Sequence, residues 1–171
     1  MPPLDFDSLW QRVVAQFSLP ESLVHGPDHW RRVDRNARLL ARSNGGDLTV
    51  VRLFALFHDS RREDDGADPA HGARGAALAE EMHSAGLFVV TDPQLQLLQF
   101  ACIWHTEGDD HPDPTIGACW DADRLDLERI GVRPSPRFMS TELARQIAGQ
   151  GSVERRLRIL AAEQQQIFAA E

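Results

Sequence analysis

The sequence contains no tyrosine, only two cysteines and no long apolar run. Cys102 and Cys119 are too few for a disulfide framework, and they lack the CxxC spacing of zinc or redox motifs. No stretch approaches the roughly 20 apolar residues that cross a bilayer, so no membrane partner is expected. Residues 1–7 are acidic and do not lead from a basic segment into an apolar one, unlike a signal peptide. We therefore expect a cytoplasmic protein.

A cluster of basic residues is also missing. The 18 basic and 26 acidic residues give a net charge of −8, and the basic ones are scattered among acids. Binding of a nucleic-acid duplex needs clustered cations, so the sequence disfavours it. The short pairs Arg31-Arg32 and Arg61-Arg62 could still hold a single phosphate. A chain of 171 residues is long enough for one domain, which we expect to span residues 1–171.

Apolar residues recur at three- and four-residue intervals, which predicts an all-α protein of about seven to eight helices. The predicted helices span residues 5–17, 27–43, 47–59, 69–84, 92–106, 114–130, 140–149 and 152–169. Proline at the first helical position and glycine after the last support several of these boundaries. The segments 60–68 and 107–115 are polar and rich in Gly, Asp and Pro, which predicts surface loops. Residues 87–91 are the only strand-like stretch, and they read as a connector.

Several predicted helices carry an ionisable residue where their pattern calls for an apolar one. These residues are His29, His58, His71, His105 and Asp123. A single buried histidine is commonly a hydrogen-bonded core residue. Five such residues on separate helices instead indicate a shared partner, because burying a charged group costs several kcal/mol unless it is paired or coordinated.

The sixth predicted helix offers two aspartates, Asp121 and Asp123. Asp123 continues an apolar seam through Cys119 and Leu127, whereas Asp121 falls beside Arg124 on a more polar face. The pattern therefore favours Asp123 as the buried carboxylate.

A divalent metal ion is the partner that accounts for these residues. Asp59 follows His58 directly, and His29, His58, Asp59 and Asp123 together offer two imidazole and two carboxylate ligands. This mixture without thiolate suits Mn²⁺, Fe²⁺, Co²⁺ or Ni²⁺, and it is compatible with Mg²⁺ and Zn²⁺. Coordination positions left open for water and substrate are typical of a catalytic metal site.

The same residues resemble the HD-domain superfamily of metal-dependent phosphohydrolases. The matching segments are HGPDHWRRV around His29, LFALFHDSRRED around His58-Asp59, DPAHGARGA around His71 and CWDADRLD around Asp123. The resemblance covers about residues 22–130. It implies an all-α bundle around a central metal site, and it also selects Asp123, the aspartate directly before arginine. We expect the C-terminal helices, residues 140–170, to pack on the core that bears these motifs.

The resemblance implies two further roles. In some branches of the superfamily, extra histidines hold a second metal and the HD aspartate bridges the two ions. His71 and His105 could do so here, or they could contact phosphate or transfer protons. Several relatives carry a catalytic acid three residues after the HD aspartate, but this position is Arg62 here. Either Glu63 or Asp64 serves from a shifted loop, or the chain uses another base.

The expected activity is hydrolysis of a small phosphorylated metabolite, with a nucleotide favoured, by a metal-activated water. Arg62 is a candidate catalytic cation, and further candidates for binding the substrate are His25, Arg32, Arg61 and Arg124. The same order of ligands also fits an HD-type di-iron oxygenase. A non-catalytic nucleotide-binding module is a third alternative, against which the complete ligand set argues. A homo-oligomer is compatible with the sequence.

Overall fold

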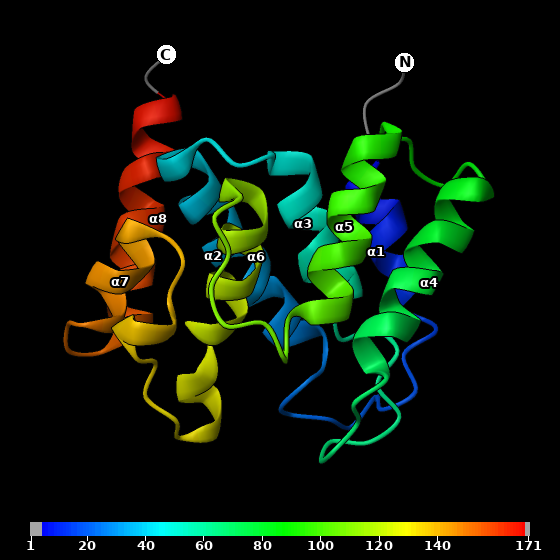
Figure 1. Cartoon of the computed structure of the whole chain (residues 1–171), viewed down its shortest axis with the longest axis horizontal. Coiled ribbons are helices and arrows are strands. Elements are labelled where there is room, and N and C mark those ends of the chain that lie inside the picture. The colour runs from blue at the N-terminus through cyan, green and yellow to red at the C-terminus, as the bar shows by residue number, and fades with distance from the viewer. Residues whose placement is uncertain (1–4, 170–171) are drawn as a thin grey trace.

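The computed structural model describes residues 5–169, with side chains through residue 164. Residues 1–4, part of the acidic N-terminal segment, and residues 170–171 lie outside it. The α-helices are α1 (Phe6–Val14), α2 (Pro27–Asn44), α3 (Leu48–Phe57), α4 (His71–Ser84), α5 (Asp92–Trp104), α6 (Pro114–Arg124), α7 (Glu142–Ala148) and α8 (Val153–Ala169). Two 3₁₀ turns follow α6, η1 (Leu127–Ile130) and η2 (Pro136–Phe138). Residues 5–169 contain no strand, so the all-α prediction is confirmed (Figure 1).

Side-chain caps explain where several helices begin. Asp47 accepts hydrogen bonds from the amides of residues 49 and 50 at the start of α3, and Asp113 caps α6 in the same way. Thr91 and Gln94 form a capping box on α5. The prediction that a helix starts at residue 69 is wrong, although Asp68 before it is a residue type that commonly caps helices. The Asp68 carboxylate instead accepts from the Glu63 amide and pairs with Arg74, and α4 begins at His71.

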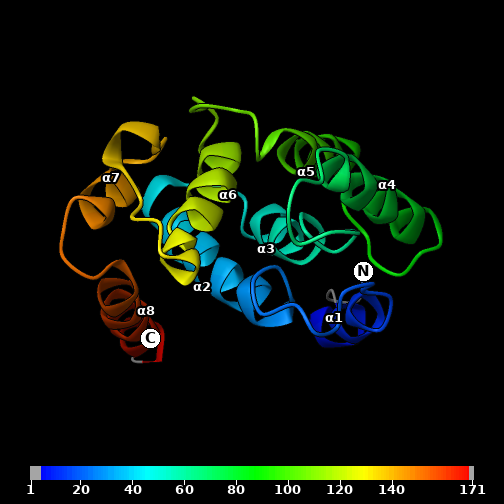
Figure 2. The same ribbon diagram turned by 90° about the horizontal axis from the view of Figure 1, so that it is seen from below.

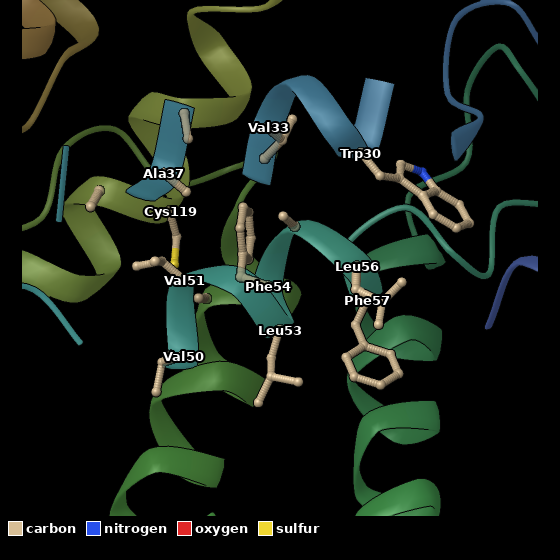
Figure 3. Packing of buried hydrophobic residues seen from close by; sticks show 14 of the residues in the cluster. Trp30, Val33, Ala37, Val50, Val51, Leu53, Phe54, Leu56, Phe57 and Cys119 are labelled. Carbon is tan, nitrogen blue, oxygen red and sulfur yellow. The ribbon is translucent and has the colours of Figure 1, made fainter. Parts of the chain in front are cut away.

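Helix α3 lies at the centre of the molecule. Figure 2 shows it between α2 on one side and the α4–α5 pair on the other. Its residues Val50 to Phe57, Arg52 excepted, are buried, which agrees with a sequence that is apolar around the whole helix. Figure 3 shows Phe54 pointing toward Val33 and Ala37 of α2, and Val51 beside Cys119 of α6.

Two glycines let α4 approach its neighbours closely. A Cβ atom at Gly75 would meet the main chain of Phe57 and His58, and one at Gly72 would meet the main chain of Cys102. Larger residues at these positions would hold α4 away from α3 and α5. The connector 87–91 returns from α4 to α5 without forming a strand, as predicted.

Helices α7 and α8 are fastened to the rest by buried or half-buried polar contacts. Arg35 of α2 makes two hydrogen bonds to the Glu154 carboxylate of α8, at 2.9 and 2.6 Å. Asp121 of α6 accepts hydrogen bonds from the main-chain amides of Ser140 (2.8 Å) and Thr141 (2.7 Å), just before α7. Within the described part of the chain, none of the helices combines the length and the apolar character needed to cross a membrane.

Candidate metal centre

The ends of five helices converge on one side of the bundle, the lower side in Figure 1. The side chains that meet there are His29 in the first turn of α2, His58 and Asp59 directly after α3, His71 at the start of α4, His105 directly after α5, and Asp123 in the last turn of α6. The four histidines and Asp59 are at most 5% exposed. The prediction that these ionisable residues face the interior is therefore confirmed for all four imidazoles.

Four ligand atoms form a first cluster. Nε2 of His29 lies 3.2 Å from Nε2 of His58, 3.6 Å from Oδ2 of Asp59 and 3.2 Å from Oδ1 of Asp123. Nε2 of His58 lies 3.7 Å from the same Asp59 oxygen and 3.9 Å from the same Asp123 oxygen. Ligand atoms that share one ion at about 2.1 Å stand about 3.0–3.4 Å apart. The observed spacing is close to what a single divalent ion requires.

The other oxygen of Asp59 belongs to a second cluster. Oδ1 lies 3.2 Å from Nε2 of His71 and 3.8 Å from Nε2 of His105, and these two nitrogens are 2.9 Å apart. The groups His29–His58–Asp59 and Asp59–His71–His105 each have the spacing of a metal site. Asp59 therefore joins two adjacent clusters through its two oxygens.

The hydrogen bonds of the ring nitrogens show why a cation fits here. Nδ1 of His58, His71 and His105 each faces a main-chain carbonyl oxygen, and Nδ1 of His29 faces the Asp126 carboxylate. Since only a protonated Nδ1 can donate to these acceptors, each Nε2 is left with a lone pair directed into a cluster. Lone pairs facing each other at 2.9 and 3.2 Å repel unless a cation lies between them. The residues present thus fit one or two metal ions.

Four of the five pKa shifts in the clusters agree with this ligand set. Burial lowers the pKa of His58 to about 3 and also lowers the pKa of His71, which keeps both imidazoles neutral. Burial acts in the same direction on His29, but the Asp123 and Asp126 carboxylates outweigh it and raise its pKa. Burial alone would raise the pKa of Asp59 and Asp123; the surrounding imidazoles instead hold both below their usual range. Neutral imidazoles and ionised carboxylates are the forms that bind a metal.

A pocket of about 280 Å³ opens onto the two clusters through Asp59, His105 and Asp123. Its remaining polar lining is mainly cationic or basic, and it consists of His25, Arg62, Arg124, Arg129 and Thr106. Leu127 and Ile130 supply an apolar wall. A pocket of this size and charge suits a compact anion.

The pocket arginines are held by loops near the site. Nε of Arg62 donates a hydrogen bond to Oδ1 of Asp59 at 3.0 Å, and Nη1 donates to two carbonyl oxygens of its own loop. Arg124 donates to the carbonyl oxygens of Gly108, Asp109 and Phe138, which ties the 107–113 loop to the segment before α7. Both side chains, predicted as candidate site residues, line the pocket.

Four other predicted site residues lie elsewhere. Arg32 donates to Asp126 at 2.7 Å and does not line the pocket, and Arg61 donates to Gln16 at 2.9 Å and lines a different hollow. The Glu63 side chain is 70% exposed and lies 3.6 Å from Arg74 in that same hollow. Asp64 is exposed as well. The 60–68 loop turns the side chains of Arg61, Glu63 and Asp64 outward, so neither carboxylate reaches the clusters as a catalytic base and Arg61 does not reach the pocket. Arg32 does not reach the pocket either, because it is bound to Asp126.

The reasoning that placed Asp121 on a polar face is wrong. Asp121 is fully buried, and burial raises its pKa, although its hydrogen bonds to the Ser140 and Thr141 amides act in the opposite direction. The Asp123 side chain is 18% exposed. Asp121 supports the chain before α7, whereas Asp123 faces His29 and His58.

Sequence reasoning missed two residues of the site, Asp126 and Arg129. Nδ1 of His29 lies 2.7 Å from Oδ2 of Asp126, and Arg129 lines the pocket with Nε bound to the Val24 carbonyl oxygen at 2.8 Å. A signal was present, because Asp123, Asp126 and Arg129 follow one another at intervals of three residues. This spacing places them on one side of the α6 end and η1.

A crystal structure of a predicted HD superfamily hydrolase from an uncultured Thermotogales bacterium is similar to this chain. The two share 25% sequence identity with a TM-score of 0.65, and the match covers 96% of this chain and 91% of that one. No protein-family model matches the sequence, and a search of curated proteins gives no match.

Proposed function

The chain belongs to the HD-domain superfamily, and on this premise we propose that it is a metal-dependent phosphohydrolase acting on a small phosphorylated metabolite. The observation that carries the proposal is the pair of clusters joined by Asp59, with imidazole lone pairs directed into both. His29, His58, Asp59 and Asp123 would hold the first ion. A divalent ion held there supplies Lewis acidity, which activates water and stabilises negative charge on a phosphoryl group.

The pocket cations support a phosphorylated substrate. Arg62, Arg124 and Arg129 line it, and contacts to main-chain oxygens fix each of them in place. Guanidinium groups fixed in advance lose little entropy when they bind an oxyanion. We propose that they orient the phosphoryl group while Leu127 and Ile130 contact the organic part of the substrate. The pocket volume of about 280 Å³ lies at the lower end of ligand sites and favours a compact metabolite, such as a mononucleotide.

His105 has two possible roles, which depend on the number of ions. It lines the pocket, and its Nε2 is free of any main-chain partner. With one ion bound, we propose that His105 accepts a proton from the attacking water, with His71 at 2.9 Å as its partner. With two ions, His71 and His105 are ligands of the second one. Metal analysis of wild type and of the variant His71→Ala distinguishes the two cases.

The experiment that tests the proposal is a screen of phosphorylated metabolites with Mn²⁺, Co²⁺, Ni²⁺ and Mg²⁺. Asp59→Ala and His58→Ala should each lose the ion of the first cluster and with it phosphatase activity. Arg61→Ala is a matched surface control, because this arginine lies outside the pocket, and it should retain both. Variants of Asp59 and His58 that keep metal and activity would contradict the proposal.

The second cluster also favours one other candidate, an HD-type di-iron oxygenase. Asp59 offers one oxygen to each cluster, as a carboxylate bridging two irons would. This alternative requires two irons per chain and consumption of oxygen. Elemental analysis of protein purified without added metal, followed by an oxygen-electrode assay, separates it from the phosphohydrolase.

A further inference from the structure

His29 differs from the other three imidazoles in the group that holds its Nδ1. His58, His71 and His105 face carbonyl oxygens of the main chain, which no substitution removes. His29 faces a side chain, Oδ2 of Asp126, at 2.7 Å. The proton position on His29 therefore depends on the identity of one other residue.

Asp126 is itself held on both of its oxygens. Its side chain is 6% exposed, and Oδ1 accepts a hydrogen bond of 2.7 Å from Nε of Arg32. Nε of Arg129 lies 3.8 Å from Oδ2, on the side of His29. An ionised carboxylate can only accept hydrogen bonds, so it satisfies His29 and Arg32 at once.

We propose that Asp126, oriented by Arg32, is a positioning residue that keeps the proton of His29 on Nδ1 and so leaves Nε2 free to bind the metal. A carboxylate behind a ligating imidazole fixes the ring and strengthens it as a ligand. The inference rests on the proposed metal site and goes beyond it, because it assigns a role to two residues that lie outside the ligand set.

Asparagine at position 126 cannot accept the hydrogen bonds of both His29 and Arg32. An amide has one oxygen, and Arg32, always charged, takes it. The amide NH₂ then faces Nδ1 of His29, which must give up its proton and carry one on Nε2 instead. The ring would keep its place, but the atom that should bind the metal would be blocked. The same exchange beside a catalytic histidine in serine proteases selects the wrong tautomer while the geometry stays intact.

The removal of Arg32 should reverse this loss. In the double variant Arg32→Ala/Asp126→Asn, the amide oxygen is free to turn toward His29 and Arg129. Arg32→Ala alone leaves the carboxylate on His29 but removes the contact that orients it, so this variant should bind metal more weakly than wild type and more tightly than the single variant Asp126→Asn. Asp121→Asn is the matched control, because Asp121 is also buried and also accepts two hydrogen bonds, but from main-chain amides.

The test is calorimetric titration of the metal-free full-length chain with Co²⁺, with folding of each variant checked by circular dichroism. D126N should bind Co²⁺ about 10- to 100-fold more weakly than wild type. The double variant should regain most of this loss, and D121N should bind as wild type does even where its melting temperature falls. Equal affinity in wild type and D126N, or no recovery in the double variant, would overturn the role of Asp126 and Arg32.

Nitrogen-15 NMR of the histidine rings tests the inference on the wild-type chain, should D126N fail to fold. Nδ1 of His29 should be protonated in the metal-free protein, and a bare Nδ1 would overturn the proposal. Failure of the metal site itself is distinguishable, because wild type would then take up no Co²⁺ at all.

Discussion

Replacement of Gly75 by alanine tests the close approach of α4 to the centre of the fold. The added Cβ would overlap the carbonyl oxygen of Phe57, and it would lie 3.2 Å from the carbonyl carbon of Phe57 and 3.3 Å from the carbonyl oxygen of His58. These are main-chain atoms, which cannot rotate away, so the overpacking penalty should reach about 3 kcal/mol, the upper end of its range. Alanine is the better helix former by about 1 kcal/mol. The expected net loss is therefore about 2 kcal/mol.

The loss is measured by urea denaturation and calorimetry of the metal-free protein. For a chain of this size, about 2 kcal/mol corresponds to a melting temperature lower by about 4–8 °C. Gly151→Ala is the control, because nothing lies within 4 Å of a Cβ at that position, and it should range from neutral to about 1 kcal/mol stabilising. A Gly75→Ala protein as stable as wild type would refute the close packing of α4 on α3.

Four further predictions concern charge, metal and loops. Burial acts to raise the pKa of Glu154, but Arg35 outweighs it and holds that pKa below its usual value. Glu154→Gln should therefore lower the free energy of unfolding by about 1–2 kcal/mol at pH 7. Urea titrations should show this difference shrinking below about pH 4, because the wild-type carboxylate becomes protonated there. Removal of metal by a chelator should lower stability by about 2.7 kcal/mol relative to protein with the ion at 100 times its Kd, as calorimetry would detect. Arg124→Ala should speed hydrogen exchange in residues 107–113, because the guanidinium no longer holds two of their carbonyl oxygens. Glu63→Gln and Asp64→Asn should leave phosphatase activity unchanged, and a large loss in either would restore that residue as the base.

Helical periodicity and cap residues were sufficient to predict the helices. The predicted starts at 27 and 92 agree with Pro27 and Asp92, and the glycine stop after α2 agrees with the left-handed Gly45 (φ 80°). Helix ends were less predictable where tertiary contacts compete with local signals. The Asp68 carboxylate is taken by Arg74 and the Glu63 amide, so the helix expected from residue 69 starts at His71.

The same limit applied to the site. The four buried histidines could be identified because each stands at a position where the helical pattern calls for an apolar residue. That pattern indicates which side of a helix is buried. It favoured Asp123 over Asp121 for a wrong reason, since Asp121 is the more buried of the two and they differ in their partners. The direction of the 60–68 loop side chains, such as Glu63, depends on hydrogen bonds that no local pattern encodes. Asp126 was missed although its three-residue spacing from Asp123 was a signal, because its hydrogen bond to His29 is a tertiary contact that no local pattern encodes.

The central claim is that His29, His58, Asp59 and Asp123 form a metal site. Elemental analysis of purified wild type and of His58→Ala, side by side, tests it most directly. We predict one or two equivalents of a divalent transition metal per wild-type chain and a loss of the first-cluster ion in the variant. Wild-type protein without bound metal after incubation with Mn²⁺, Co²⁺ and Ni²⁺, or a variant with undiminished metal content, would contradict the account.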